Sequence, residues 1–293
     1  MIIDIHAHCY RKAYLNMPGS DPWPTPETLL PRYDKMGVDK AVIQLLIGPE
    51  YYLPTTNEDA LEIAATYPGR FIPFCNIHPQ AFGNSPFTKL EKVMMRYKEA
   101  GCKGIGEVIV NRHFTDPFMQ NFFRAVEETG FPMTIHVAHR VGGCYGIVDE
   151  PGLPELDETL TRFPNLKILG HAMSFWSEIG PLETVYGRAG YPKGKITEDG
   201  ALVKIMRKHS NLYGDLSAGS GANALIRDPD YAVKFMTEFQ DRLCFGIDIC
   251  SANERPSDHW LLDFMNQMLA EKRISQDIYD KIMYKNAVAI LGL

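Results

Sequence analysis

The sequence lacks an excess of basic residues, any long apolar run and a recognisable secretory signal. Its 30 Lys and Arg are outnumbered by 36 Asp and Glu among 293 residues, giving a net charge of −6. This balance argues against nucleic-acid binding. No stretch approaches the ~18 apolar residues of a membrane span, and no basic segment followed by an apolar one opens the chain. We therefore expect neither nucleic acid nor a membrane as a partner.

The six cysteines are spread along the chain and include no C-x-x-C pair. Such a distribution is typical neither of a zinc-binding knuckle nor of a redox motif. We expect the thiols to be reduced and mostly buried, as in a cytoplasmic protein.

No Pro/Gly/Ser-rich linker or low-complexity segment divides the chain, which predicts one domain over residues 1–293. Short apolar segments alternate with segments of helical periodicity. The predicted strands cover residues 1–8, 39–46, 70–77, 101–109, 131–136, 165–171, 211–217 and 242–248. The predicted helices cover residues 26–36, 57–67, 86–100, 117–129, 153–163, 199–209, 222–239, 257–271 and 275–291.

This alternation predicts a parallel sheet, and eight strand–helix units in under 300 residues favour an α/β fold with a single (β/α)8 TIM barrel. A doubly wound open sheet is the alternative. However, the opening lacks the G-x-G-x-x-G turn that is typical of nucleotide-binding members of that class.

The first predicted strand ends in His6-Ala7-His8. Alternate side chains of a strand share a face, so His6 and His8 project together and could hold one metal ion. The pair alone leaves a simple surface role open, because a zinc site normally needs three or four ligands.

Further residues of ligand type stand at or near the ends of other predicted strands: Glu107, His136, His171 and Asp248. The loops of a barrel converge at the C-terminal ends of its strands. Each residue alone could simply satisfy hydrogen bonds. Burying all of them together without a cation would be costly, so the sequence predicts a divalent metal site.

Aromatic and basic residues follow these strands, among them Tyr51, Tyr52 and the predicted substrate-binding residues Arg112, His139, Arg140 and Tyr145. Arginine binds carboxylates bidentately, so this rim suits a small, flat, anionic substrate. Loop packing or a subunit interface is the alternative role, and we expect a homo-oligomer. The irregular residues 172–197 are a candidate lid or oligomer contact.

The ordered set His6-x-His8, Glu107, His136, His171 and Asp248 resembles the amidohydrolase superfamily of metal-dependent barrels. Local stretches are similar to its amidohydrolase-related (amidohydrolase 2) branch, which contains aromatic-acid decarboxylases and metal-dependent hydrolases. They are residues 4–8 (DIHAH), 163–171 (FPNLKILGH), 211–217 (NLYGDLS) and 243–248 (LCFGID). The resemblance spans essentially the whole chain and is specific for the fold and the metal site rather than for a substrate.

The resemblance implies that His6, His8, His136 and Asp248 bind metal. His171 is either a ligand of a second ion or a neutral hydrogen-bonding and acid/base group. Glu107 occupies the strand on which many relatives carry a carboxylated lysine between two ions. One or two ions are thus expected, zinc first and manganese as the alternative.

The function implied is hydrolysis of a small amide, lactone or ester. Bound metal lowers the pKa of water toward neutrality, Asp248 acts as general base and then acid, and His171 helps to stabilise the oxyanion. The alternative is non-oxidative decarboxylation, or hydration, of an aromatic or unsaturated acid. Relatives that decarboxylate generally use one metal and do not depend on the Glu, so Glu107 favours hydrolysis. A non-enzymic metal-binding protein and a deoxyribonuclease are weaker alternatives.

Overall fold

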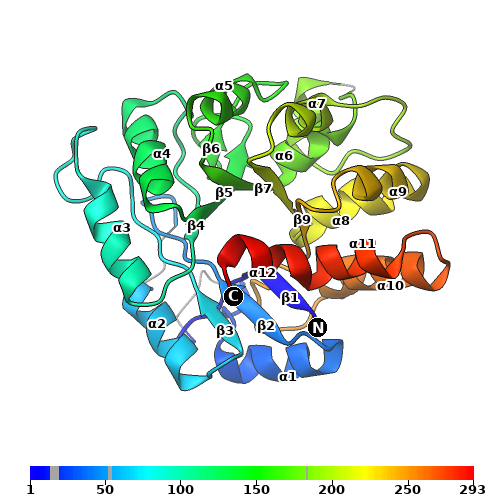
Figure 1. Cartoon of the computed structure of the whole chain (residues 1–293), viewed down its shortest axis with the longest axis horizontal. Coiled ribbons are helices and arrows are strands. Elements are labelled where there is room, and N and C mark those ends of the chain that lie inside the picture. Colours follow the sequence, from blue (N-terminus) through cyan, green and yellow to red (C-terminus); the bar gives the residue numbers. More distant parts are fainter. Residues whose placement is uncertain (14–19, 52–54, 183) are drawn as a thin grey trace.

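The computed structural model describes residues 1–13, 20–51, 55–182 and 184–293 (Figure 1). Its central strands run parallel in two sheets. The first contains, in order, β1 (Ile3–Ala7), β2 (Lys40–Ile43) and β3 (Phe71–Pro73). The second contains, in order, β4 (Ile105–Val108), β5 (Pro132–Ala138), β7 (Lys167–His171), β8 (Leu212–Asp215) and β9 (Leu243–Cys244).

Two parallel bridges join the sheets into a ring. Cys75, just beyond β3, pairs with Ile105 of β4, and Ala7 of β1 pairs with Ile249 beyond β9. Each of these strands therefore has a parallel neighbour on both sides. The predicted (β/α)8 TIM barrel is confirmed.

Helices surround the ring and connect its strands (Figure 1). They are α1 (Pro26–Met36), α2 (Asn57–Thr66), α3 (Leu90–Glu99), α4 (Pro117–Thr129), α5 (Pro154–Arg162), α7 (Ala201–Lys208), α8 (Ala218–Ile226), α9 (Pro229–Glu238) and α10 (Trp260–Ala270). Shorter helical segments are α6 (Met173–Trp176), η1 (Ser177–Ile179), η2 (Val185–Ala189) and η3 (Pro256–His259), and the chain closes with α11 (Gln276–Asp280), η4 (Lys281–Lys285) and α12 (Asn286–Leu291).

Proline and glycine set the ends of the best-predicted helices. α1 begins at Pro26 and α4 at Pro117, where the absent N–H of proline costs no helical hydrogen bond. Both end at a glycine, Gly37 with φ 73° and Gly130 with φ 70°, a left-handed conformation that glycine adopts without steric cost. The sequence predicted the bounds of both helices correctly.

The hydrophobic core has two parts. Inside the barrel, a cluster joins residues of several strands to α12, which crosses the middle of the ring in Figure 1: Ile3, Ile5, Val42, Ile72, Phe74, Leu169, Cys244, Ala287, Ile290 and Leu291. A larger cluster lies between the strands and the outer helices. Ile5 belongs to the inner cluster and Ala7 to the outer one, and the register of β1 shifts between Asp4 and Ala7. This irregularity lets Ile5 fill the barrel while the histidines that follow face its open end.

The last strand of the ring, β9, is shorter than the predicted strand 242–248. The side chain of Asp4, and not a neighbouring strand, accepts a backbone hydrogen bond from the residues that follow β9. Beyond β9, the backbone N–H of Ile247 donates to Asp4 Oδ1 at 2.9 Å instead of to a strand. The N–H of Phe245 donates to the carbonyl of Ile282 in η4. The sequence analysis also missed β6 (Ile147–Val148), which pairs with the end of β5 outside the ring.

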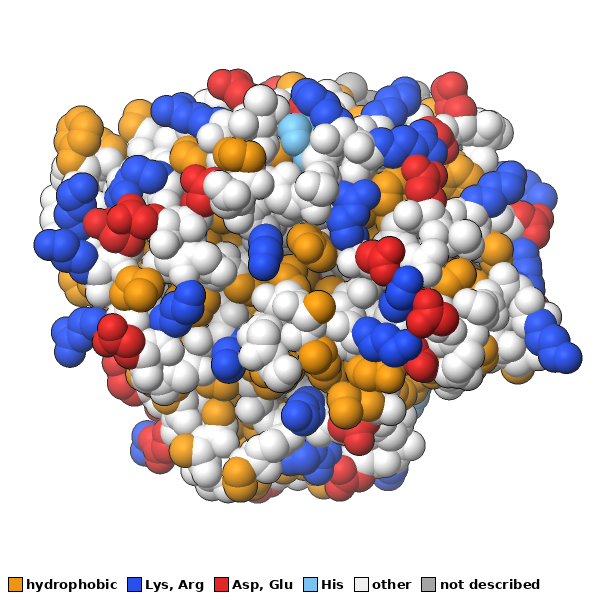
Figure 2. Space-filling view, in the orientation of Figure 1, with side chains coloured by type: hydrophobic (Ala, Val, Ile, Leu, Met, Phe, Trp, Pro, Cys, Tyr) orange, Lys and Arg blue, Asp and Glu red, His pale blue; other side chains and the backbone are white. Residues whose placement is uncertain are grey.

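On the face seen in Figure 2, basic and acidic side chains lie among one another, with apolar side chains scattered between them. Among the helices of the described residues, none is both long and apolar enough to span a membrane.

One buried ion pair ties α1 to η3, which lies beyond β9. The side chains of Arg32 and Asp258 are 8% and 9% exposed, and Arg32 Nη2 lies 2.5 Å from Asp258 Oδ2. Arg32 Nη1 also donates to the carbonyl of Ser251. We predict that Asp258→Ala lowers the free energy of unfolding by about 3–5 kcal/mol, because it leaves a buried guanidinium unpaired.

Chemical denaturation would measure this loss, with Asp230→Ala as the matched control. Asp230 pairs with Arg273 but its side chain is 73% exposed, so its loss should cost at most about 1 kcal/mol. Equal effects of the two substitutions would contradict the prediction.

Candidate metal centre

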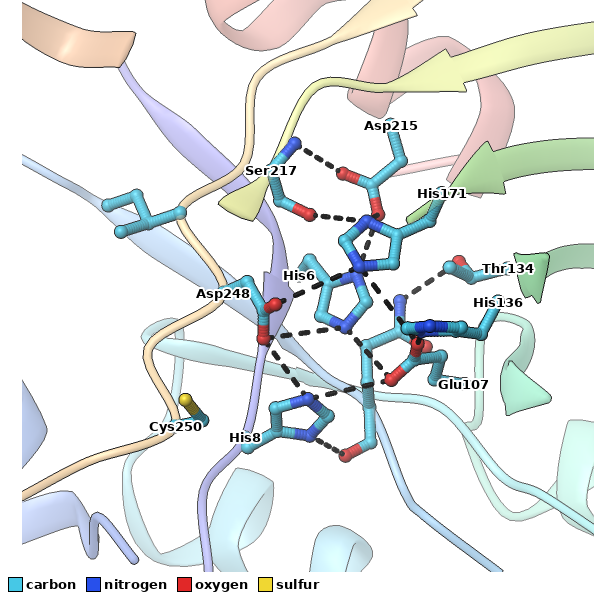
Figure 3. A network of polar contacts seen from close by, with 12 residues as sticks. His6, His8, Glu107, Thr134, His136, His171, Asp215, Ser217, Asp248 and Cys250 are labelled. Atoms are coloured by element: carbon cyan, nitrogen blue, oxygen red, sulfur yellow. Dashed lines mark hydrogen bonds and ion pairs between the residues drawn. The ribbon is translucent and has the colours of Figure 1, made fainter. Parts of the chain in front are cut away.

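The side chains predicted at the strand ends converge at one end of the barrel (Figure 3). His6 lies in β1, Glu107 in β4 and His136 in β5, and His171 ends β7. His8 follows β1 directly, and Asp248 lies four residues beyond the end of β9. The strands thus bring together residues that are up to 242 positions apart, as the barrel geometry predicts.

Four of these residues surround one point. Glu107 Oε2 lies 3.4 Å from His6 Nε2 and 3.6 Å from His8 Nε2. Asp248 Oδ1 lies 3.2 Å from His8 Nε2 and 3.9 Å from His6 Nε2. Ligands about 2.1 Å from a tetrahedral zinc ion are about 3.4 Å apart. The four carboxylate–nitrogen distances therefore lie near the spacing expected around one ion, and His6, His8 and Asp248 form one group of possible ligands.

The hydrogen-bond pattern supports the same fit. His6 Nε2 is buried and makes no hydrogen bond within the described part of the chain. An unpaired buried ring nitrogen costs free energy unless a ligand meets it. Its nearest neighbours are carboxylates, as expected for a nitrogen that faces a shared cation. The residues present thus fit a divalent ion.

Glu107 also faces a second group of possible ligands, formed with His136 and His171. Its Oε1 atom lies 2.7 Å from His136 Nδ1 and 4.0 Å from His171 Nε2. The shorter distance is that of a charge-assisted hydrogen bond, in which His136 donates to the carboxylate. An ion between the two would require them to separate.

Electrostatics link these groups. Burial opposes the charge of Glu107, but His6 and the hydrogen bond from His136 outweigh it and hold the pKa of Glu107 well below its usual range. Burial likewise opposes the charge of His6, yet the surrounding carboxylates raise the pKa of His6 well above its usual value. Burial, and then the charge of His6, lower the pKa of His171 to about 4. The carboxylates thus outweigh burial at His6 but not at His171.

Two residues that the sequence analysis did not single out stand behind the histidines. Asp215, which ends β8, is fully buried, and its Oδ2 accepts a hydrogen bond from His6 Nδ1 at 2.6 Å. Ser217 Oγ lies 3.0 Å from His171 Nδ1. Both belong to the stretch 211–217. The position of Asp215 at a predicted strand end was the available signal.

The predicted substrate-binding residues lie at different distances from this centre. The ring of Tyr145 packs on His136 with 4.5 Å between centroids. Arg112 donates to Asp116 and Gln80, in a surface cavity that also contains His78. Arg140 is exposed and His139 half-buried. Their roles in binding stay predictions.

An edge-to-face row of aromatic rings runs from His8 through Trp23 and Tyr51 to Tyr145, with centroids 5.5, 5.9 and 5.4 Å apart. Because Tyr145 packs on His136, the row joins two residues of the candidate metal centre. Tyr52, predicted at the same rim, lies outside the described residues.

The family comparison agrees with this geometry. The family described as amidohydrolase (Amidohydro_2) matches residues 3–293. The chain belongs to the amidohydrolase family, whose members are enzymes, and the resemblance stated from the sequence is confirmed. No functionally curated protein matches the chain.

Solved structures of similar fold include both predicted kinds of enzyme. A probable 2-pyrone-4,6-dicarboxylic acid hydrolase from Acinetobacter baumannii, with citric acid bound, is 15% identical, with 100% of this chain and 99% of that chain covered and a TM-score of 0.63. A 5-carboxyvanillate decarboxylase from Novosphingobium aromaticivorans, complexed with manganese and a nitrobenzoic acid, is 18% identical, with coverage of 100% and 96% and a TM-score of 0.62. An uncharacterised TIM-barrel protein from Bordetella bronchiseptica is 18% identical, with coverage of 99% and 98% and a TM-score of 0.64. At these identities the likeness shows the fold alone.

The spacing of the donor atoms predicts about one tightly bound zinc ion per chain. We expect Glu107→Gln to weaken zinc binding by at least about 100-fold, because the amide loses the charge of a direct ligand. Competition with a chelator would measure the affinity, and elemental analysis the content.

Glu155→Gln is the matched control, since Glu155 pairs with His113 on the rim instead of with the cluster. Two zinc ions per chain, or an unchanged affinity in Glu107→Gln, would contradict this arrangement.

Proposed function

We propose that this protein is a metal-dependent hydrolase of a small amide, lactone or ester. The observation that supports it most is the orientation of Glu107, which turns into the site so that one oxygen lies within 3.4–3.6 Å of both His6 and His8. With Asp248, the chain then offers four donors to one ion. Histidine nitrogens and carboxylate oxygens suit zinc, and manganese as the alternative.

The number of donors favours hydrolysis over decarboxylation. Catalytic zinc sites reach at most about five ligands, so four protein donors leave one position. A single position suits a water molecule, whereas clamping a substrate through a carboxylate and a neighbouring oxygen needs two. A divalent ion held here would lower the pKa of such a water to about 7.

Asp248 combines a ligand oxygen with an oxygen that could carry a proton. Its side chain is 19% exposed, compared with at most 4% for His6, His8 and Glu107, so it borders the open side of the site. Oδ1 faces His8, while Oδ2 lies 3.8 Å from His171 Nε2. In the proposed reaction Asp248 accepts the proton of the attacking water at Oδ2 and returns it to the leaving nitrogen or oxygen.

His171 would assist from the other side by donating a hydrogen bond to the oxygen that gains charge. The proposed substrate is a small anion. Tyr145, at the wall of the site, and Arg140, His139 and Arg112, farther out on the rim, are its proposed contacts. Cytoplasmic location and homo-oligomeric assembly belong to the same proposal.

Decarboxylation of an aromatic acid is the second candidate. The aromatic row from His8 to Tyr145 supports it, because aromatic side chains beside the centre offer edge-to-face or stacking contacts to a flat unsaturated ring.

A panel of lactones, esters and amides, and of aromatic carboxylic acids, tests both candidates on the zinc- and manganese-loaded protein. We expect turnover of a member of the first group without release of carbon dioxide. With that substrate, Asp248→Asn should lower kcat by about 10²- to 10⁴-fold, because the variant cannot accept the proton.

Glu155→Gln should keep the wild-type kcat. Release of carbon dioxide from an aromatic acid, with no hydrolysis of any ester, amide or lactone, would replace the first candidate by the second.

A further inference from the structure

A mostly exposed segment, residues 189–195, lies between two buried anchors. Before the segment, the buried side chain of Arg188 pairs with Glu178, with 2.8 Å between Nε and Oε1. After it, the buried Ile196 donates its backbone N–H to Asp228 Oδ2 at 2.9 Å. Breaking a buried ion pair or leaving a buried N–H without an acceptor is costly. The segment is therefore held at both ends.

This segment brings a large aromatic side chain, Tyr191, to the start of α8. Asn223 of that helix donates its side-chain N–H to the carbonyl of Pro192 at 3.0 Å. The hydroxyl end of Tyr191 lies over Gly219, where an added Cβ atom would come within 3.1 Å of Tyr191 Oη and 3.7 Å of Trp260 Cζ3. The missing side chain of Gly219 thus leaves room for both aromatic rings.

The start of α8 borders the open side of the candidate metal centre. The backbone N–H of Ala218, the first residue of α8, donates to the carbonyl of Ile247, the residue before Asp248. Asp248 and Cys250 lie on one loop at the edge of the centre (Figure 3). Partial burial, and then these two neighbours, raise the pKa of the Tyr191 hydroxyl. Because charge interactions weaken with distance, Tyr191 lies near Asp248.

The rings of Tyr191 and Trp260 are only partly covered. Their side chains are 46% and 47% exposed, although both pack at Gly219. Exposed apolar surface that gathers beside a polar site is typical of a ligand contact. Aromatic rings offer stacking and edge-to-face contacts to flat groups. The two rings therefore form an aromatic surface beside the centre.

In the proposed reaction Asp248 returns a proton to the leaving nitrogen or oxygen, so the leaving part of the substrate passes beside Asp248. We propose that Tyr191 is a specificity-determining residue that contacts this leaving part, and that the leaving part is a flat aromatic group. The substrate is then an aryl ester or an anilide and not a lactone, whose leaving oxygen stays attached to the acid. This inference rests on the proposed function, but the aromatic contact is measurable without turnover.

The first test measures the binding of a leaving group alone. The probe is 4-fluorophenol, titrated into the full chain with and without zinc and followed by fluorine NMR. We expect Tyr191→Ala to weaken binding about 3- to 10-fold, because an aromatic contact is lost. Tyr191→Phe keeps the ring and should bind like wild type. Phe87→Ala is the matched control, because Phe87 is 85% exposed and lines a surface cavity beside α4 instead of the centre.

Hydrolysis then tests the link to the reaction. The substrates are the phenyl ester and the methyl ester of the acid that the substrate panel identifies. The ratio of kcat/KM for the phenyl ester to kcat/KM for the methyl ester should fall about 3- to 10-fold in Tyr191→Ala. The ratio should stay at the wild-type value in Tyr191→Phe and Phe87→Ala, because neither variant removes the ring beside Asp248.

Equal affinity for 4-fluorophenol in Tyr191→Ala and Phe87→Ala, or no binding to wild type, would overturn the contact. If Tyr191→Ala keeps the wild-type affinity and forms a smaller assembly in sedimentation, the ring belongs to an interface between copies of the chain, and the proposal is wrong. Weaker binding in Tyr191→Ala, without hydrolysis of any ester or amide by wild type, would keep the aromatic contact and overturn the proposed function together with the leaving-group assignment.

Discussion

The arrangement of the site depends on one constraint: ionisable groups of both signs are buried together at the open end of the barrel. Glu107 and Asp215 are almost completely buried, and His6, His8 and His171 lie among them. Such groups are costly to bury without partners. The oxygens of Asp215 accept hydrogen bonds from His6 and from the backbone N–H of Ser217. The Nε2 atoms of His6 and His8 face the carboxylates of Glu107 and Asp248. A cation held among these groups would offset the cost of burying them together.

The barrel supplies the rigidity that this arrangement needs. Parallel strands hold the site residues at fixed neighbouring positions, and the paired ends of β5 and β7 put His136 and His171 side by side. Asp4 connects the two strands at the seam of the ring, because it accepts hydrogen bonds from the backbone of His6 and of Ile247 and from the hydroxyl of Tyr33. The peptide groups that precede Asp248 are thereby fixed although β9 has already ended.

The chemistry then follows from small differences between similar residues. His6 and His171 are both buried imidazoles, yet one is backed by a carboxylate and the other by a hydroxyl. Glu107 and Asp248 both face the histidines, but only Asp248 borders the open side. In the proposed function, Glu107 with the histidines would hold an ion, and Asp248 at the open side would accept and return the proton.

The sequence by itself determined the fold class, the family and the six residues that converge at the strand ends. Alternating periodicities require a parallel sheet, and a closed parallel barrel brings all strand ends to one face. Only the tertiary structure decided which atoms meet. Asp215 was visible as a strand-end residue, but its contact with His6 spans 209 positions and depends on the register of β1 and β8. Likewise, Arg112 follows β4 as predicted, yet it turns to Asp116 because side-chain direction depends on neighbours that are distant in the sequence. Local patterns specify which elements form, whereas hydrogen-bond partners are set by distances that exist only after the ring has closed.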